Sequence, residues 1–359
     1  MPIRVNAHLS TRCLARKRKV AVLCEKNNIS YHIVRPIEAW LRLAYDAGIR
    51  RRIFSNMQRM NKRFFLNFFL VVSLIWPAGV NGWGEHGHLL SGLVAAQKMP
   101  DATPRFFRRA TQQLSYLNPE PDRWKERAES DLDPSVRSLS PDHYLDMEFV
   151  PAGALTTAGD RHAFIEALGK AGRKPAEAGF LPYRILEMFQ TLRIEFRLWR
   201  ATTTDAKKRK MIEQRIINDA GILGHYVADG ANPHHTTMHH NGWVGDNPKG
   251  FSTDNTIHFR FESQYVQTHV QAKEVAPLVG EARVLAKPRE EVIAFLQASK
   301  SHLEELYELE KQEKFGEATK SEAHKKFAQA RLAAGAQMLR DLWWTAWVTS
   351  EATTKPATK

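Results

Sequence analysis

The segment HYVADGANPHH, residues 225–235, constrains the fold of this chain more than any other stretch of its sequence. His225 and Asp229 are one helical turn apart, so on a helix their side chains point to the same side. Gly230 and Pro233 would end such a helix, and His235 returns from the loop that follows. The pattern indicates a helix end that presents metal-ligand side chains.

A second pair, His258 and Glu262, repeats the same spacing further along the chain. Imidazole nitrogens and carboxylate oxygens are the ligands that zinc takes where cysteine is absent. One pair of this kind is usually a surface or capping pair, but two pairs in one region make metal binding as good an explanation as a solvated loop. The other histidines of interest are assigned to loops: His86, His234, His239 and His240.

Apolar side chains elsewhere follow helical spacing. Five of them, spaced by three or four residues, form one stripe: Ile185, Phe189, Leu192, Phe196 and Trp199. Residues 332–346 contain another stripe, and residues 205–229 and 289–313 are long, charged and free of proline, which also suits helices. Loops are expected where Pro, Gly, Asp and Asn gather, at 116–160, 171–183, 231–256 and 276–288. Because alternating strand patterns are scarce, we expect a single all-α, multi-helix domain over residues 83–350 and a disordered tail at 351–359.

Residues 60–82 have the features of a secretory signal peptide. The basic pair Lys62-Arg63 precedes an apolar run at 64–76, and small residues follow just before Trp83. The run is short for a membrane span, and an uncleaved anchor is the alternative. Cleavage before Trp83 would deliver the domain to the periplasm or to the exterior.

The charge of the chain is concentrated before this signal. Met60 is the expected initiator, so residues 1–59 are interpreted as a gene-model extension or a basic leader. Up to Arg63 there are 15 Lys and Arg against 3 Asp and Glu, a net charge of +12, and the whole chain has +13. The basic charge is therefore no argument for a nucleic-acid surface on the exported domain. Both cysteines, Cys13 and Cys24, also precede the domain, which accordingly has no disulfides.

Two further regions offer ligands. The expected mature N-terminus, WGEHGHLL, would begin with the amine of Trp83, which can chelate a cation together with its own carbonyl oxygen, and His88 follows. In the uncleaved chain that nitrogen is an amide, so this ligand requires signal cleavage. His143 lies in DHYLDME, where an upstream aspartate would join it: Asp122, Asp131 or Asp133.

Together these motifs resemble those of the three-zinc phosphodiesterase superfamily, which contains the bacterial zinc-dependent phospholipases C and the single-strand nucleases of the S-one/P-one type. The phospholipase signature H-Y-x-x-D-x-x-x-P-x-H is matched by His225, Tyr226, Asp229, Pro233 and His235. The downstream pair of the family is matched by His258 and Glu262. Residues 83–88 match the W-G-x-x-G-H start of the nuclease branch, and residues 143–146 match the family's H-[YF]-x-D motif. The resemblance covers roughly residues 83–350.

The resemblance implies a role for each position. Asp229 would bridge two zinc ions, the first completed by His143, His225 and an upstream aspartate, and the second by Trp83 and His88. A third zinc would be held by His235, His258 and Glu262. The upstream aspartate is assigned to Asp122, with Asp131 as the alternative, and Asp122 is also the candidate catalytic base. Nine metal ligands are implied: Trp83, His88, Asp122, His143, His225, Asp229, His235, His258 and Glu262.

The resemblance also implies an exported enzyme that hydrolyses phosphate diesters with metal-activated water. The loop at 231–256 lacks the G-G-N stretch of the nuclease branch, which favours a phospholipase C-like enzyme, whereas the W-G start favours a nuclease on single-stranded DNA or RNA. Phospholipid or single-stranded nucleic acid is the expected substrate, with transient contact to a membrane surface and no stable protein partner. Trp243 and Phe251 would stack a base, contact a lipid or pack the loop.

Two alternatives of other classes stay open. One is a zinc-stabilised secreted protein without catalysis. The other retains the basic leader and is associated with a membrane or with nucleic acid.

Overall fold

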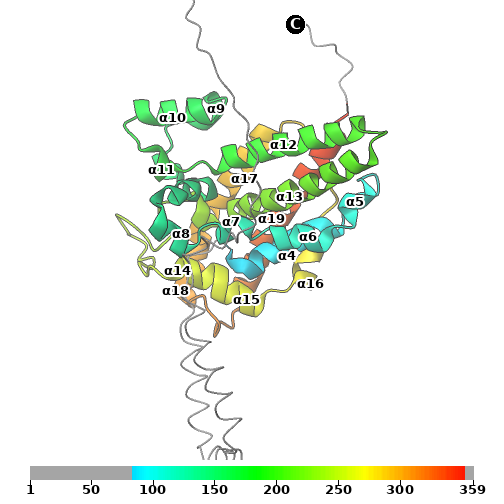
Figure 1. The fold of residues 1–359 in the computed structure, drawn as a ribbon. Helices are drawn as coiled ribbons and strands as arrows, with labels where there is room; N and C mark the ends of the chain where they lie inside the picture. The colour runs from blue at the N-terminus through cyan, green and yellow to red at the C-terminus, as the bar shows by residue number, and fades with distance from the viewer. Residues whose placement is uncertain (1–82, 352–359) are drawn as a thin grey trace, which may run out of the picture. The chain divides into compact units, whose positions relative to one another are not determined.

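The computed structural model describes residues 83–351, which form helices and the segments that join them, with no strand in that range (Figure 1). The expected all-α fold class is therefore confirmed. The leader at 1–59, the signal peptide at 60–82 and the tail from residue 352 lie outside the described residues. Among residues 83–351, no helix combines the length and the hydropathy that a bilayer crossing requires.

Helix α13 (Ala206–Ala231) lies at the centre of the fold. It packs against α12 (Leu181–Ala201), α19 (Glu322–Val348), α4 (Gly84–Gln97) and α6 (Thr111–Leu117). Four side chains of its inward face, spaced by three or four residues, are completely buried: Ile216, Ala220, Leu223 and Val227. This burial holds the C-terminal half of α13 in a fixed position against its neighbouring helices.

Helices α12 and α13 form an antiparallel hairpin. The carboxylate of Asp205 accepts a hydrogen bond from the backbone N–H of Lys208 at 2.8 Å and so caps the start of α13. The apolar stripe expected on α12 is confirmed at four of its five positions, because Ile185, Phe189, Leu192 and Phe196 are all buried, whereas Trp199 is half-buried.

Several of the expected segments differ from the structure. Residues 289–313 form two helices rather than one, α17 (Pro288–Ser301) and α18 (Leu303–Gln312), and His302 lies at the break with its Nδ1 bonded to Glu305 at 2.7 Å. The expected loop at 116–160 contains several short helices because local caps stabilise them. One such cap is the carboxylate of Glu126, which accepts from two backbone N–H groups of the next turn. The other expected loops at 171–183 and 276–288 also contain short helices, α11 (Pro175–Ala178) and η5 (Ala276–Leu278).

The remaining elements are short or lie at the periphery. They are α5 (Arg105–Arg108), α7 (Glu120–Arg123), α8 (Arg127–Leu132), η1 (Pro134–His143), η2 (Met147–Phe149), α9 (Ala154–Thr157), α10 (Arg161–Lys170), η3 (Pro233–Thr236), α14 (Ile257–Phe259), η4 (Arg260–Tyr265), α15 (Val266–His269) and α16 (Ala272–Val275).

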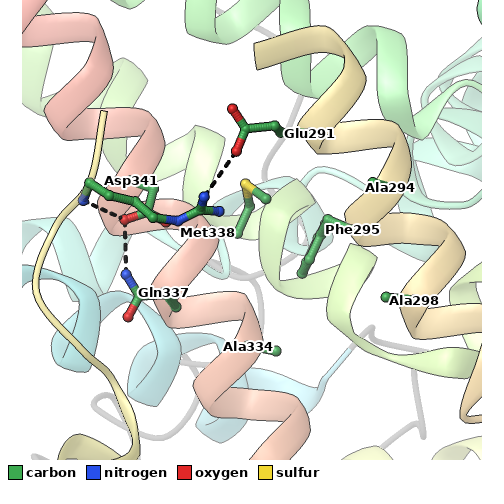
Figure 2. A pocket seen from close by; sticks show the side chains of 9 residues that line it. Glu291, Ala294, Phe295, Ala298, Ala334, Gln337, Met338 and Asp341 are labelled. Carbon is green, nitrogen blue, oxygen red and sulfur yellow. Dashed lines mark hydrogen bonds and ion pairs between the residues drawn. The ribbon is translucent and has the colours of Figure 1, made fainter. Parts of the chain in front are cut away.

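A cavity of about 390 Å³ lies between α17 and α19 (Figure 2). Phe295, Met338 and three alanines line its apolar part. The polar groups at its rim bond to one another, since Arg283 Nε donates to Asp341 at 2.9 Å and Gln337 Nε2 donates to the same carboxylate at 2.8 Å. None of the nine candidate ligands lines this cavity, so it is separate from the site described next.

Candidate metal centre

The last turns of α13 position the first two ligands. His225 and Asp229 are completely buried, and His225 Nε2 lies 3.2 Å from Asp229 Oδ2. The helix ends at Ala231, and the side chain of Asn232 accepts from the backbone N–H of His234 at 3.1 Å, which starts η3. His235 Nε2 then lies 3.9 Å from Asp229 Oδ1. The structure thus forms the helix end expected from the sequence, with all three side chains facing one place.

Eight of the nine candidate ligands form three buried groups, and in each group the ligand atoms lie within 4.8 Å of one another. The first group is His88, His225 and Asp229; the second is Asp122, His143 and His225; the third is His235, His258 and Glu262. Three buried groups that could hold metal ions are therefore present.

Asp229 faces both of the first two groups. Its Oδ2 lies 3.0 Å from His143 Nδ1, and its Oδ1 lies 3.4 Å from His88 Nε2. A carboxylate whose two oxygens point to different ligand sets has the arrangement that a bridging ligand needs, and the bridging role of Asp229 stays a prediction.

The structure distinguishes between the upstream aspartates. Asp122 on α7 is buried, and its carboxylate lies 3.7 Å from the Nε2 atoms of both His225 and His88. Asp131 is exposed on α8, and Asp133 caps η1 by accepting from the N–H of Ser135. Only Asp122 joins the ligand groups.

His258 and Glu262 meet as their spacing predicts, with Nε2 2.7 Å from Oε2. The backbone between them passes from α14 into η4, a π-helical turn, rather than continuing as one regular α-helix. Asn232 Nδ2 donates to Glu262 Oε2 at 3.2 Å, so the residue that follows α13 also orients a ligand of the third group. Short π-helical turns occur often at functional sites.

Trp83 lies beside these groups without joining them through its side chain. Its indole is completely buried, donates from Nε1 to the carbonyl of Ala228 at 2.5 Å and packs on Phe261 at 5.4 Å. Those contacts place the first described residue next to the positions that precede Asp229 and Glu262. Coordination by its amine depends on signal cleavage and stays a prediction.

Asn118 holds two of the imidazole rings and was not found from the sequence. Its carbonyl accepts from His225 Nδ1 at 3.0 Å, and its side-chain Oδ1 accepts from His88 Nδ1 at 3.1 Å. This leaves the Nε2 atoms facing the carboxylates, an arrangement typical of metal-ligating histidines. Glycine is required at 224 because a Cβ there would lie 2.2 Å from Asn118 Nδ2. No local motif marks Asn118, since its role depends on this close packing.

We expect Asn118→Ala to weaken metal binding by roughly 10- to 100-fold, because the ring of His88 would lose the acceptor that fixes its orientation. Asn118→Asp keeps an acceptor oxygen and should retain metal. Metal affinity is measured by competition with a chromophoric chelator. Equal affinity in the alanine variant and the parent protein would contradict this role.

Burial and neighbouring charges set the protonation of the ligands. Burial opposes the charged form of both Asp229 and Asp122. The imidazoles around Asp229 nevertheless lower the pKa of its carboxyl. The imidazoles of His225 and His88, together with Lys125, lower the pKa of Asp122. Burial lowers the pKa of His258 to about 4 and, with the charge of His88, that of His225 to about 3. Two ligands shift the other way: burial raises the pKa of Glu262 to about 7, and Asp229 raises that of His88 although burial opposes it. Ionised carboxylates and neutral imidazoles are the forms that bind metal, so metal would displace protons at these two ligands.

Several ligand atoms are buried without a hydrogen-bond partner among residues 83–351: His88 Nε2, Asp229 Oδ1 and Glu262 Oε1. Orphaned buried polar atoms are rare and costly in folded proteins. A cation at each group would satisfy them, and five imidazoles with three carboxylates form a donor set that suits zinc. The residues present therefore fit the implied metal.

Asp146, from the H-[YF]-x-D motif, lies in a neighbouring acidic cluster. Its side chain is buried, and burial together with the charge of Glu148 raises its pKa from the usual 3.8 to about 7. Glu148 itself bonds to Lys300 and, at 2.7 Å, to the hydroxyl of Thr237. Asp146 is not part of the three ligand groups.

The raised pKa predicts a pH-dependent stability. Between about pH 4 and 7 the folded protein holds a proton on Asp146 that the unfolded chain has released, so the free energy of unfolding falls as pH rises, by up to about 1.4 kcal/mol per unit. Asp146→Asn should remove this pH dependence of the free energy of unfolding. The variant should be more stable than the parent protein at pH 8 and equally stable at pH 4. Denaturant titrations at both pH values measure it, with Asp101→Asn, an exposed aspartate, as the control. Parallel pH profiles for parent and Asp146→Asn would contradict the prediction.

The aromatic side chains of the 231–256 segment pack on one another. Trp243 stacks on His239 at 4.0 Å and meets Tyr307 edge-on at 5.3 Å, and Phe251 is buried beside both. Of the three interpretations given for Trp243 and Phe251, these contacts support packing of the loop.

Two histidines assigned to loops lie elsewhere. His86 is on α4, and His234 is buried in η3 beside His258, with ring centroids 4.8 Å apart. Histidine spacing alone could not distinguish a solvated loop from a buried turn.

No family model matches the chain, and neither does any curated protein.

Proposed function

We propose that this protein is a zinc-dependent phosphodiester hydrolase of the phospholipase C kind. The observation that supports it most is the sharing of ligands between groups. His225 belongs to two groups, Asp229 faces both, and His235 of the third group lies 3.9 Å from Asp229. A structural zinc site is closed and separate, whereas a cluster of adjoining groups suits a substrate that spans several cations.

The residues would divide the chemistry among them. His143, His225, Asp122 and Asp229 would hold one zinc, His88 and Asp229 a second with the Trp83 terminus, and His235, His258 and Glu262 a third. Bound zinc lowers the pKa of water towards neutrality and neutralises charge on a phosphoryl group. Asp122, which stays ionised, would accept the proton of the attacking water as general base. No serine or cysteine nucleophile is required.

Lys125 is a cation directly beside this centre. Its Nζ lies 2.5 Å from Asp122 Oδ1, and its side chain is 21% exposed, so it can reach an anionic group of a bound substrate. We expect Lys125→Met to lower kcat/KM on a phosphodiester by roughly 10- to 1,000-fold, as loss of one charged stabilising group does, while the bound metal is retained. Lys125→Arg should recover part of the loss. An unchanged kcat/KM in Lys125→Met would remove the lysine from the mechanism.

The substrate class is tested by a paired assay on the exported, zinc-loaded protein. One arm offers phosphatidylcholine vesicles and the other single-stranded DNA and RNA, each with a chelator-treated control. Chelator-sensitive release of phosphorylated head group supports the phospholipase proposal. Chelator-sensitive release of nucleotides assigns the same centre to a nuclease. Bound zinc without turnover in either arm favours the zinc-stabilised protein without catalysis.

Export is proposed with the enzyme, because the Trp83 ligand requires a cleaved signal. Sequencing the N-terminus of protein from the periplasm or the medium tests it. A terminus at Trp83 supports secretion and the ninth ligand. A retained leader would exclude coordination by the Trp83 amine and favour the membrane- or nucleic-acid-associated alternative.

A further inference from the structure

The end of the α12–α13 hairpin that is remote from the ligand groups concentrates positive charge. Residues 193–215 contain eight Lys and Arg against three Asp and Glu. The chain after Arg63 is nearly neutral by contrast, since the 15 basic and 3 acidic residues up to Arg63, taken from totals of 52 and 39, leave 37 against 36. The charge of the domain is therefore segregated onto this surface rather than spread over it.

The acidic residues of the hairpin end neutralise only part of this charge. Glu195 pairs with Arg215 at 2.8 Å, Glu213 pairs with Lys210 at 3.3 Å, and Asp205 caps α13. Within residues 83–351, no carboxylate forms an ion pair with four basic side chains of the hairpin: Arg193, Arg197, Lys207 and Lys208.

Helix α5 extends the same surface. Phe106 packs on Trp199 with ring centroids 5.2 Å apart, which brings the exposed Arg105 and Arg109 beside the hairpin end. Figure 1 shows α5 next to the adjoining ends of α12 and α13, at the right of the view and away from α7 and α14, which carry ligands. We call the hairpin end with α5 the basic surface.

Aliphatic side chains are exposed on the basic surface. Ile194 is 58% exposed, Leu198 42% and Met211 53%, and Ile194 and Leu198 lie one turn apart on the same side of α12. The aromatic rings nearby are covered instead. Arg209 lies over Trp199 at 3.7 Å and Arg200 over Trp347 at 3.4 Å, so neither guanidinium-covered face is open to stack a nucleic-acid base.

We propose that the basic surface docks on an anionic phospholipid bilayer. Lys and Arg attract acidic head groups, and aliphatic side chains among them enter the boundary with the acyl chains. Nucleic acid fits less well, because single strands are bound by open aromatic faces as well as by charge. The surface lies roughly 24 Å along α13 from His225, at 1.5 Å per residue from Arg209. Docking is therefore separate from the ligand groups and does not depend on the proposed hydrolase activity.

A local probe tests the docking. A polarity-sensitive fluorophore is attached at Leu198→Cys in the exported protein, whose domain has no other cysteine, and at Leu278→Cys as a control on an exposed residue of η5. Vesicles of phosphatidylcholine with phosphatidylglycerol are compared with phosphatidylcholine alone. We expect a blue shift only for the probe at 198 and only with the acidic lipid.

Charge reversal completes the test. The triple variant Arg197→Glu, Lys207→Glu and Lys208→Glu should raise the lipid concentration that gives half of the blue shift at residue 198 by more than about tenfold. Lys273→Glu with Lys320→Glu and Lys326→Glu reverses three exposed charges elsewhere and should leave it unchanged. Equal effects of the two triple variants, an equal shift at Leu278, or no shift at Leu198 would overturn the proposal. A shift at 198 with single-stranded DNA but not with vesicles would also overturn it and assign the surface to nucleic acid.

Discussion

Asp229→Asn is expected to lower phosphodiester hydrolysis by about a thousandfold or more, because the variant loses the carboxylate that faces two ligand groups at once. Asp229 lies 3.0 Å from His143, 3.2 Å from His225 and 3.4 Å from His88. No other described carboxylate is this close to three candidate imidazoles. The amide would keep one acceptor oxygen but no charge, so it could not hold two cations together.

The measurement pairs kcat/KM with elemental analysis of the bound metal. Asp219→Asn serves as the control, since it makes the same change on the same helix, where Asp219 is half-buried and bonds to Asn218. The control should keep both activity and metal. Full metal content and activity in Asp229→Asn would contradict the bridging role.

Removing metal is expected to destabilise the folded protein strongly. The ligand groups bring five imidazoles and three carboxylates out of water, and buried groups of this kind without partners cost free energy. Because metal binds the folded state and not the unfolded chain, its binding free energy adds to stability. We expect chelation to lower Tm by about 10 °C or more.

Scanning calorimetry with chelator, and again after zinc is added back, measures this effect. The parent protein should recover its Tm with zinc, whereas magnesium, which prefers oxygen ligands, should restore little. A Tm that chelation leaves unchanged would mean that these buried groups do not hold a metal ion.

Much of the centre could be predicted from local sequence because its ligands sit on spacings that a helix converts into a shared face. His225 with Asp229, and His258 with Glu262, are pairs of this kind, and the apolar stripe of α12 fixes its buried side in the same way. Periodicity predicts such features because it depends only on the geometry of one element.

Other parts depend on contacts between distant segments. Asn118 reaches His88 and His225 only because glycines at 92 and 224 let α4, α6 and α13 approach closely. Lys125 meets Asp122 only through the short helix α7 and the turn that follows it, in a region expected to be a loop. The choice between Asp122 and Asp131 was open for the same reason, since burial rather than spacing separates them.

The central claim is that the buried groups hold zinc and that this zinc is needed for hydrolysis of phosphate diesters. The most direct test follows hydrolysis of bis(4-nitrophenyl) phosphate by the exported protein as zinc is removed with a chelator and titrated back. We expect activity to disappear with the metal and to return as zinc refills the three groups. Unchanged turnover in the metal-free protein, or complete zinc binding with no hydrolysis of this diester, of phospholipid or of nucleic acid, would contradict it.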